Sequence, residues 1–88
     1  MTLNDEQVQA RIEKLEQEER SLRSDESEAA QHERPDKVAA DADRLAAIRV
    51  ELDQLWDYLR QRRALRDAGA DPDGAQMRDK NTVERYLG

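Results

Sequence analysis

Two neighbouring side chains are the first candidates for metal chemistry. His32 is the only histidine, and Glu28 precedes it by four residues, which is about one helical turn. Both could contact one ion from the same helix face. A catalytic zinc site, however, takes three protein ligands, and the di-iron sites of helical bundles take Glu-x-x-His pairs. Ala29 stands three residues before His32, so neither pattern is present. We expect His32 to be solvated and the chain to hold no metal.

The other catalytic arrangements are also missing from the sequence. Acid–base catalysis by carboxylates needs a pocket that shifts their pKa values, and a small helical unit offers no dry pocket. The serines have no histidine base in a suitable arrangement. The three glycines are dispersed and form no loop that could hold a phosphate. We therefore expect no catalytic residue, no cofactor and no enzymatic activity.

An arginine cluster is the strongest local charge feature. It consists of Arg60, Arg62, Arg63 and Arg66. These side chains could contact nucleic-acid phosphates, with Trp56 or Tyr58 stacking on bases. They could equally match the negative end of a helix dipole and be neutralised by the acidic start of another helix. We favour the second interpretation and keep a nucleic-acid-associated regulator as the alternative function.

The composition of the whole chain favours long helices. The 88 residues carry 21 acidic and 15 basic side chains, a formal net charge of −6. Leu, Ile, Val and Phe together number only 15, which alone is typical of disorder. Ala, Glu, Lys, Leu and Arg number 46, just over half of the residues, which is typical of coiled coils. The spacing of the apolar residues decides between the two.

The composition also excludes several classes of protein. Without cysteine there is no disulfide scaffold and no thiolate metal site. No apolar run approaches the ~20 residues of a membrane span, and the first residues do not resemble a secretory signal. The acidic balance disfavours general nucleic-acid binding. We expect a cytoplasmic protein that does not associate with membranes.

The first helix is expected over about residues 4–31. Asn4 and Gln7 have the spacing of a capping box, and Leu3 and Val8 that of a hydrophobic staple. Glu19 interrupts the apolar stripe that follows. The stripe consists of Val8, Ile12, Leu15 and Leu22.

The second helix is expected over about residues 36–68. Asp36 is its candidate N-cap, and Gly69 can adopt the left-handed conformation that ends a helix. Trp56 flanks the apolar stripe of this helix, which follows heptad spacing. The stripe consists of Val38, Leu45, Ile48, Leu52, Leu55 and Leu59.

Two helices with a short connection are predicted to fold as an all-α antiparallel hairpin. The hairpin covers residues 1–69 and resembles a coiled coil. A C-terminal tail, residues 70–88, follows, with a turn at its start and a helical turn carrying Val83, Tyr86 and Leu87. Opposite charges favour a register in which Asp5 meets Arg63.

A lone hairpin cannot bury its apolar stripes fully, because two helices form a single layer. We expect a two-fold homodimer that pairs two hairpins into a four-helix bundle. The function predicted from the sequence is that of a non-enzymatic interaction protein that self-associates. An unidentified protein partner is the other option. The core and self-association residues are Val8, Ile12, Leu15, Leu22, Leu45, Ile48, Leu52, Leu55, Trp56 and Leu59.

Residues 51–66, ELDQLWDYLRQRRALR, followed by Gly69 and by the closing motif at 83–87, carry a resemblance. They resemble a family of small actinobacterial proteins classed as a domain of unknown function. The resemblance is closest over residues 45–72 and in the tail. It implies a helical hairpin in the actinobacterial cytoplasm, and it supplies no reaction, cofactor or active residue.

Overall fold

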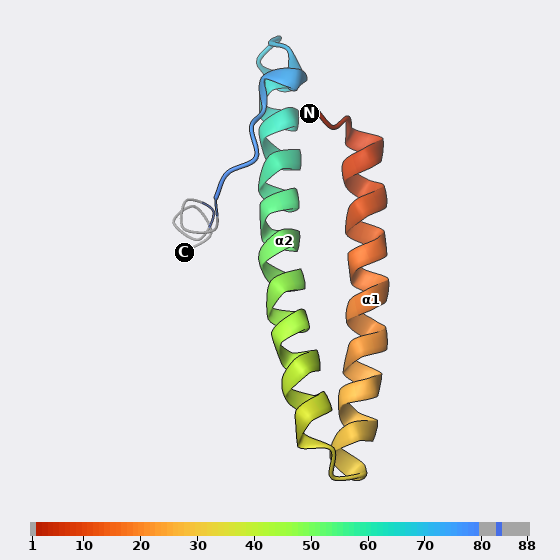
Figure 1. The fold of residues 1–88 in the computed structure, drawn as a ribbon. Helices are drawn as coiled ribbons and strands as arrows, with labels where there is room; N and C mark the ends of the chain where they lie inside the picture. Colours follow the sequence, from red (N-terminus) through yellow and green to blue (C-terminus); the bar gives the residue numbers. More distant parts are fainter. Residues whose placement is uncertain (1, 80–82, 84–88) are drawn as a thin grey trace.

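The computed structural model describes residues 2–79 and 83 and consists of a helical hairpin followed by a short turn. Helix α1 spans Asp5–Gln31, helix α2 spans Pro35–Asp67, and the 3-10 turn η1 spans Pro72–Gly74. Figure 1 shows α1 and α2 side by side in opposite directions. The molecule extends over 55 × 25 × 20 Å. The predicted all-α antiparallel hairpin is therefore confirmed.

A reciprocal capping box starts α1. The backbone N–H of Gln7 donates to Oδ1 of Asn4 at 2.8 Å, and that of Asn4 donates to Oε1 of Gln7 at 2.9 Å. Both bonds satisfy amides that have no partner inside the helix. Leu3 packs against the core that contains Val8, as a hydrophobic staple does. The local sequence thus supplies the cap of this helix.

The connection between the helices is only three residues long. Glu33 adopts a left-handed φ of 54°, and Pro35 occupies the first turn of α2, where its fixed φ suits a helix start. Arg34 is the N-cap residue, and its side chain makes no capping hydrogen bond. The N-cap thus lies two residues before Asp36, the cap that the sequence suggested.

The end of α2 is a Schellman motif. The N–H of Ala70 donates to the carbonyl of Leu65 at 2.8 Å, and the N–H of Gly69 donates to that of Arg66 at 3.0 Å. Gly69 has a φ of 75°, as the sequence predicted for the residue that ends this helix. The turn that follows is closed by Asp71, whose side chain accepts from the N–H of Asp73 at 2.9 Å.

The apolar core lies toward the open end of the hairpin, away from the connection. Partly buried side chains of Leu3, Leu22, Leu52 and Leu65 pack against it. Trp56, which the sequence placed with the core, is instead 42% exposed. The buried core residues are Val8, Ile12 and Leu15 of α1, Ile48, Leu55, Tyr58 and Leu59 of α2, and Ala75 of the tail.

Toward the connection the helix contact becomes more polar. Val38 and Leu45 are only half-buried there, whereas Asp41 is buried at the position that interrupts the heptad stripe. Oδ1 of Asp41 lies 3.8 Å from Nζ of Lys37. Oδ2 of Asp41 and Oε2 of Glu26 are buried without a hydrogen-bond partner in the structure. Burying a carboxylate without full hydrogen bonding is costly, so this half adds less stability than the open end.

The segment after η1 turns back along α2, as Figure 1 shows in blue. Ala75 belongs to the core, and Val83 is 1% exposed. Tyr86 and Leu87, which we expected in a last helical turn, lie outside the described residues. Over residues 2–79 and at 83, no helix has an apolar stretch that could cross a bilayer.

The register of the two helices differs from the one that the charges suggested. Asp5 pairs with Arg62 and Arg66 and not with Arg63, which is exposed. Midway along the hairpin, Glu18 of α1 pairs with Arg44 of α2. The expectation matched residues by height along the helices and ignored rotation about the helix axis, and rotation decides which side chains face each other.

Candidate functional site

Two arginines of the cluster, Arg62 and Arg66, bind carboxylates of the same chain. Arg62 is 5% exposed; its Nε donates to Oδ1 of Asp5 at 2.5 Å and its Nη1 to Oδ1 of Asp73 at 2.8 Å. Nη2 of Arg66 donates to Oδ2 of Asp5 at 2.9 Å. Hydrogen bonds from Arg62, and then from Arg66, hold the pKa of the Asp5 carboxyl below its usual value. This group joins the start of α1, the end of α2 and the turn.

The remaining parts of the predicted phosphate patch do not come together. Arg60 lies 3.9 Å from Oδ1 of Asp57, and Arg63 is exposed without an ion-pair partner among the described residues. Tyr58 is buried, and its hydroxyl donates to the carbonyl of Leu3 at 3.2 Å, so it offers no ring for stacking. Nucleic-acid binding stays a prediction. A salt-sensitive mobility shift with short DNA that Arg60→Glu/Arg63→Glu abolishes would support it.

Two bidentate ion pairs tie the helices together along their length. Arg11 of α1 donates to Glu51 of α2 at 2.6 and 3.0 Å. Arg44 of α2 donates to Glu18 of α1 at 2.5 and 2.9 Å. These hydrogen bonds hold the pKa of the Glu51 and Glu18 carboxyls below their usual values. Because bidentate pairs demand a defined geometry, they help to fix the register of the hairpin.

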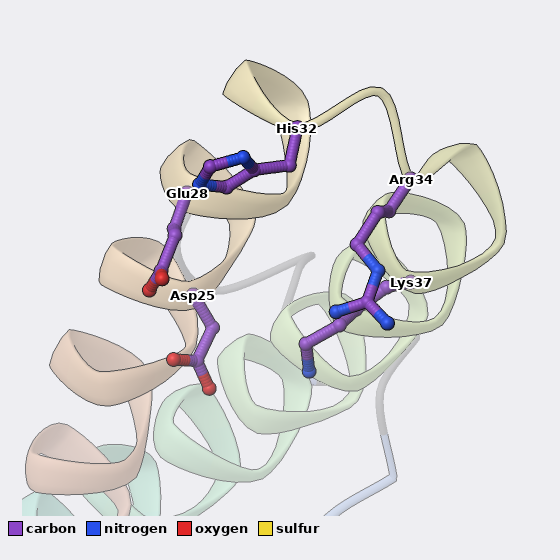
Figure 2. Close-up of a pocket in the computed structure, with 5 residues that line it drawn as sticks. All are labelled: Asp25, Glu28, His32, Arg34 and Lys37. Carbon is purple, nitrogen blue, oxygen red and sulfur yellow. The ribbon is translucent and has the colours of Figure 1, made fainter.

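A small pocket of about 200 Å³ lies at the connection between the helices. Figure 2 shows that Asp25, Glu28 and His32 line it from the α1 side, and Arg34 and Lys37 from the side of the loop and α2. All five residues are exposed. No group of three or more His, Cys, Asp or Glu suited to a metal ion occurs over the described parts of the chain. Glu28 and His32 thus lie together without a third ligand.

One side of α2 is covered by the tail. Gln61 donates from Nε2 to the carbonyl of Gln76 at 2.7 Å and accepts from its N–H at 3.1 Å. Further along, Nε2 of Gln54 donates to the carbonyl of Arg78 at 3.3 Å. Arg78 also lies 3.6 Å from the buried Asp57. The amide of Gln61 thus satisfies both backbone groups of Gln76, and that of Gln54 satisfies one carbonyl further along.

A third side of α2 is covered neither by α1 nor by the part of the tail that the structure describes, and we call it the outer face. On the helix its positions lie between Leu52, which packs against the core, and Gln61, which binds the tail. Trp56 is its largest side chain, and large exposed aromatics commonly anchor interfaces. The outer face consists of Val38, Ala42, Leu45, Ala46, Arg49, Asp53, Trp56, Arg60 and Arg63.

The outer face begins at an open apolar hollow near the connection. Pro35, Val38, Ala39 and Ala42 supply its apolar surface. From there the face continues past the half-buried Leu45 toward Trp56. The outer face thus bears apolar side chains near the connection and again at Trp56, with Arg49 and Asp53 between them.

Sequence reasoning missed the residues that engage the arginines and the tail. Asp73 lies in the turn expected at the start of the tail, and Gln61 was not singled out, yet both hold distant segments together. The only sequence signal was the density of opposite charges at residues 5 and 62–66. Self-association through the leucine-rich face from Leu45 to Leu59, which the sequence predicted, stays a prediction.

Comparison with known proteins finds relatives of the same size class in mycobacteria. The chain is 57% identical over 44 residues to the uncharacterized protein Mb0922c of Mycobacterium bovis and to the uncharacterized protein Rv0898c of Mycobacterium tuberculosis. The match covers 50% of this chain and 51% of each relative, so the chain spans about half the length of the curated relatives it matches. No solved structure matches the chain. The family described as "Protein of unknown function (DUF2630)" matches residues 4–88, and the chain therefore belongs to that family.

Proposed function

We propose that this protein is a non-enzymatic helical interaction protein that self-associates through the outer face of α2. One observation carries the proposal: Trp56 is 42% exposed on a face that already bears apolar side chains at helical spacing. Exposing a tryptophan to water forgoes much of the free energy that its burial would contribute. A partner helix on this face would recover it.

The hairpin itself uses only one side of the leucine-rich stripe. Ile48, Leu55 and Leu59 are buried in the core with α1. Leu45 and Trp56 remain on the other side, where a second layer of helix would cover them. A second copy of the same chain is the simplest source of such a layer, since most oligomers of small proteins are two-fold homodimers.

The charged groups also favour a role in binding over a role in catalysis. The buried guanidinium of Arg62 and the carboxylate of Asp5 are bound to each other, so neither is free for acid–base work. We keep the cytoplasm as the compartment, on the basis of the acidic, cysteine-free composition. Fractionation of cells that express an epitope-tagged chain tests this part of the proposal.

Sedimentation of the purified chain tests the proposed self-association. We expect a species of twice the 10.2 kDa chain mass at micromolar concentration, and Trp56→Ala should weaken association at least about tenfold. Met77→Ala is the matched control, because Met77 is 47% exposed but lies on the tail. A chain that stays at 10.2 kDa throughout, or a Trp56→Ala variant that associates like the wild type, overturns the proposal.

A further inference from the structure

We infer that two copies pair antiparallel through their outer faces, with Arg49 of each chain opposite Asp53 of the other. This inference rests on the proposed self-association and adds its geometry. The two-fold axis then passes at the level of Glu51, midway between Arg49 and Asp53. The inferred partner is thus a second copy of this chain in one defined register.

The first support is a pair of opposite charges left without partners. Arg49 is exposed and Asp53 half-buried, and neither makes an ion pair or side-chain hydrogen bond with any residue that the structure describes. By contrast, Arg11 and Arg44, which face the other helix, each bind a carboxylate with two hydrogen bonds. Arg49 and Asp53 are one helical turn apart on the outer face. A two-fold axis between them brings together two complementary pairs at once.

The same two charges disfavour the other simple arrangements. Parallel two-fold pairing places Arg49 opposite Arg49 and Asp53 opposite Asp53. If one antiparallel chain slides by one helical turn along the other, the two copies of Arg49 come together. If it slides by one turn in the opposite direction, the two copies of Asp53 come together. Like charges in direct opposition are unfavourable, so these registers are selected against. Only the register centred at Glu51 makes both contacts attractive.

The sizes of the side chains fit the same register. Trp56 of one chain lies opposite Ala46 of the other, and Arg60 lies opposite Ala42. Both alanines are exposed, so nothing within the described chain fills the space beside them. A large side chain against a small one lets two helices approach to the usual 8–10 Å between axes. The apolar contact then supplies most of the affinity, while the ion pairs set the orientation.

Charge exchange at the two positions tests the register. Arg49→Asp makes both positions acidic and Asp53→Arg makes both basic, so each variant alone should self-associate at least about tenfold more weakly than wild type. An equimolar mixture of the two variants should form a mixed dimer, because every contact in it is again between opposite charges. The double variant Arg49→Asp/Asp53→Arg should self-associate to within about threefold of the wild type.

Two further measurements complete the test. Asp43→Arg is the matched control, since Asp43 is exposed on α2 but off the outer face, and it should leave association unchanged. The chain has no cysteine, so an Arg49→Cys chain mixed with an Asp53→Cys chain should form a disulfide-linked pair faster than either alone. Circular dichroism of each variant verifies that the helices are retained.

The outcomes separate this inference from the proposed function. A wild-type dimer whose single variants associate normally, or whose mixture forms no mixed dimer, overturns the register and leaves self-association standing. A wild-type chain that stays monomeric overturns both and leaves the outer face to a different protein. A double variant that fails to recover association, although folded, also overturns the register.

Discussion

Arg62 shows how one side chain can link three segments. Its buried guanidinium donates hydrogen bonds to the carboxylates of Asp5 in α1 and Asp73 in the turn. These hydrogen bonds raise the pKa of Arg62 above its usual value. A buried charge without such partners would be costly, because it would lose its hydration without compensation. Arg63, the next residue, is exposed and free of ion pairs within the described chain. Adjacent arginines of one cluster therefore have different roles.

Removal of the Arg62 side chain is expected to destabilise the hairpin. Arg62→Ala leaves Asp5 and Asp73 without their shared donor, so the urea midpoint, followed by circular dichroism, should fall clearly. Arg63→Ala removes the same kind of side chain from an exposed site. It should change the free energy of unfolding by less than about 0.5 kcal/mol. Equal midpoints for the two variants would contradict this assignment.

Several carboxyls make the fold sensitive to acid. The pKa of Asp5 is lowered by Arg62 and Arg66, and the pKa values of Glu18 and Glu51 are lowered by hydrogen bonds from the facing arginines. A carboxyl with a lower pKa in the folded chain binds protons less readily there than in the unfolded chain. Its contribution to stability is complete above its unfolded pKa, near 4, and is lost as the pH falls through the folded pKa.

We therefore expect the urea midpoint to hold from pH 7 down to about pH 5 and to fall below about pH 4. Asp5→Asn should be less stable than wild type at pH 7 and should approach it as the pH falls through the lowered pKa of the folded Asp5, where the wild-type carboxyl also becomes neutral. Asp43→Asn, at an exposed residue, is the control and should follow the wild-type curve. A pH-independent gap between Asp5→Asn and wild type would argue against the ion pairs.

At the scale of the elements, the two outer helix ends are decided by local chemistry. The capping box at Asn4 and the Schellman motif at Gly69 each satisfy backbone groups that the helix leaves unpaired. Both depend on residues within a few positions of the helix end. This is why sequence patterns locate these two ends well.

The conformation of Gly69 should matter more than the space around it. A Cβ at Gly69 would meet nothing within 4 Å, but the φ of 75° is unfavourable for any other residue. Gly69→Ala should therefore lower the free energy of unfolding by about 1 kcal/mol. Gly74→Ala adds a Cβ in ordinary contact with Leu65 at 3.7 Å and has no positive φ, so it should be neutral or slightly stabilising. Urea titration of both variants checks the contrast.

At the scale of the whole molecule, the tail completes the open end of the hairpin. It supplies Ala75 to the core, and Gln61 and Gln54 of α2 hold its backbone. Two helices alone would leave this side of α2 uncovered. The tail is thus part of the folded unit, and over the residues that the structure describes its contacts leave the outer face of α2 open.

Shortening a buried side chain of the tail tests this conclusion. Val83 is 1% exposed, so Val83→Ala should lower the free energy of unfolding by about 2 kcal/mol through lost burial and the cavity left behind. Met77→Ala, at a site 47% exposed, should have little effect. Thermal and urea unfolding measure both. Identical stabilities would mean that the tail does not contribute to the folded unit.

The sequence by itself determined the helices, the hairpin and most of the core. Capping signals and heptad spacing depend on residues close together in the chain, and local hydrogen bonds and burial follow from them. Val8, Ile12, Leu15, Ile48, Leu55 and Leu59 were all predicted in the core and are buried.

Only the tertiary structure decided the register, the partners of the arginines and the position of Trp56. These depend on the rotation of each helix about its axis and on where the tail lies, and both are set by contacts between residues up to 61 positions apart. The sequence pattern shows that Trp56 lies beside the apolar stripe. Whether that side of α2 is buried depends on how α1, α2 and the described part of the tail pack together.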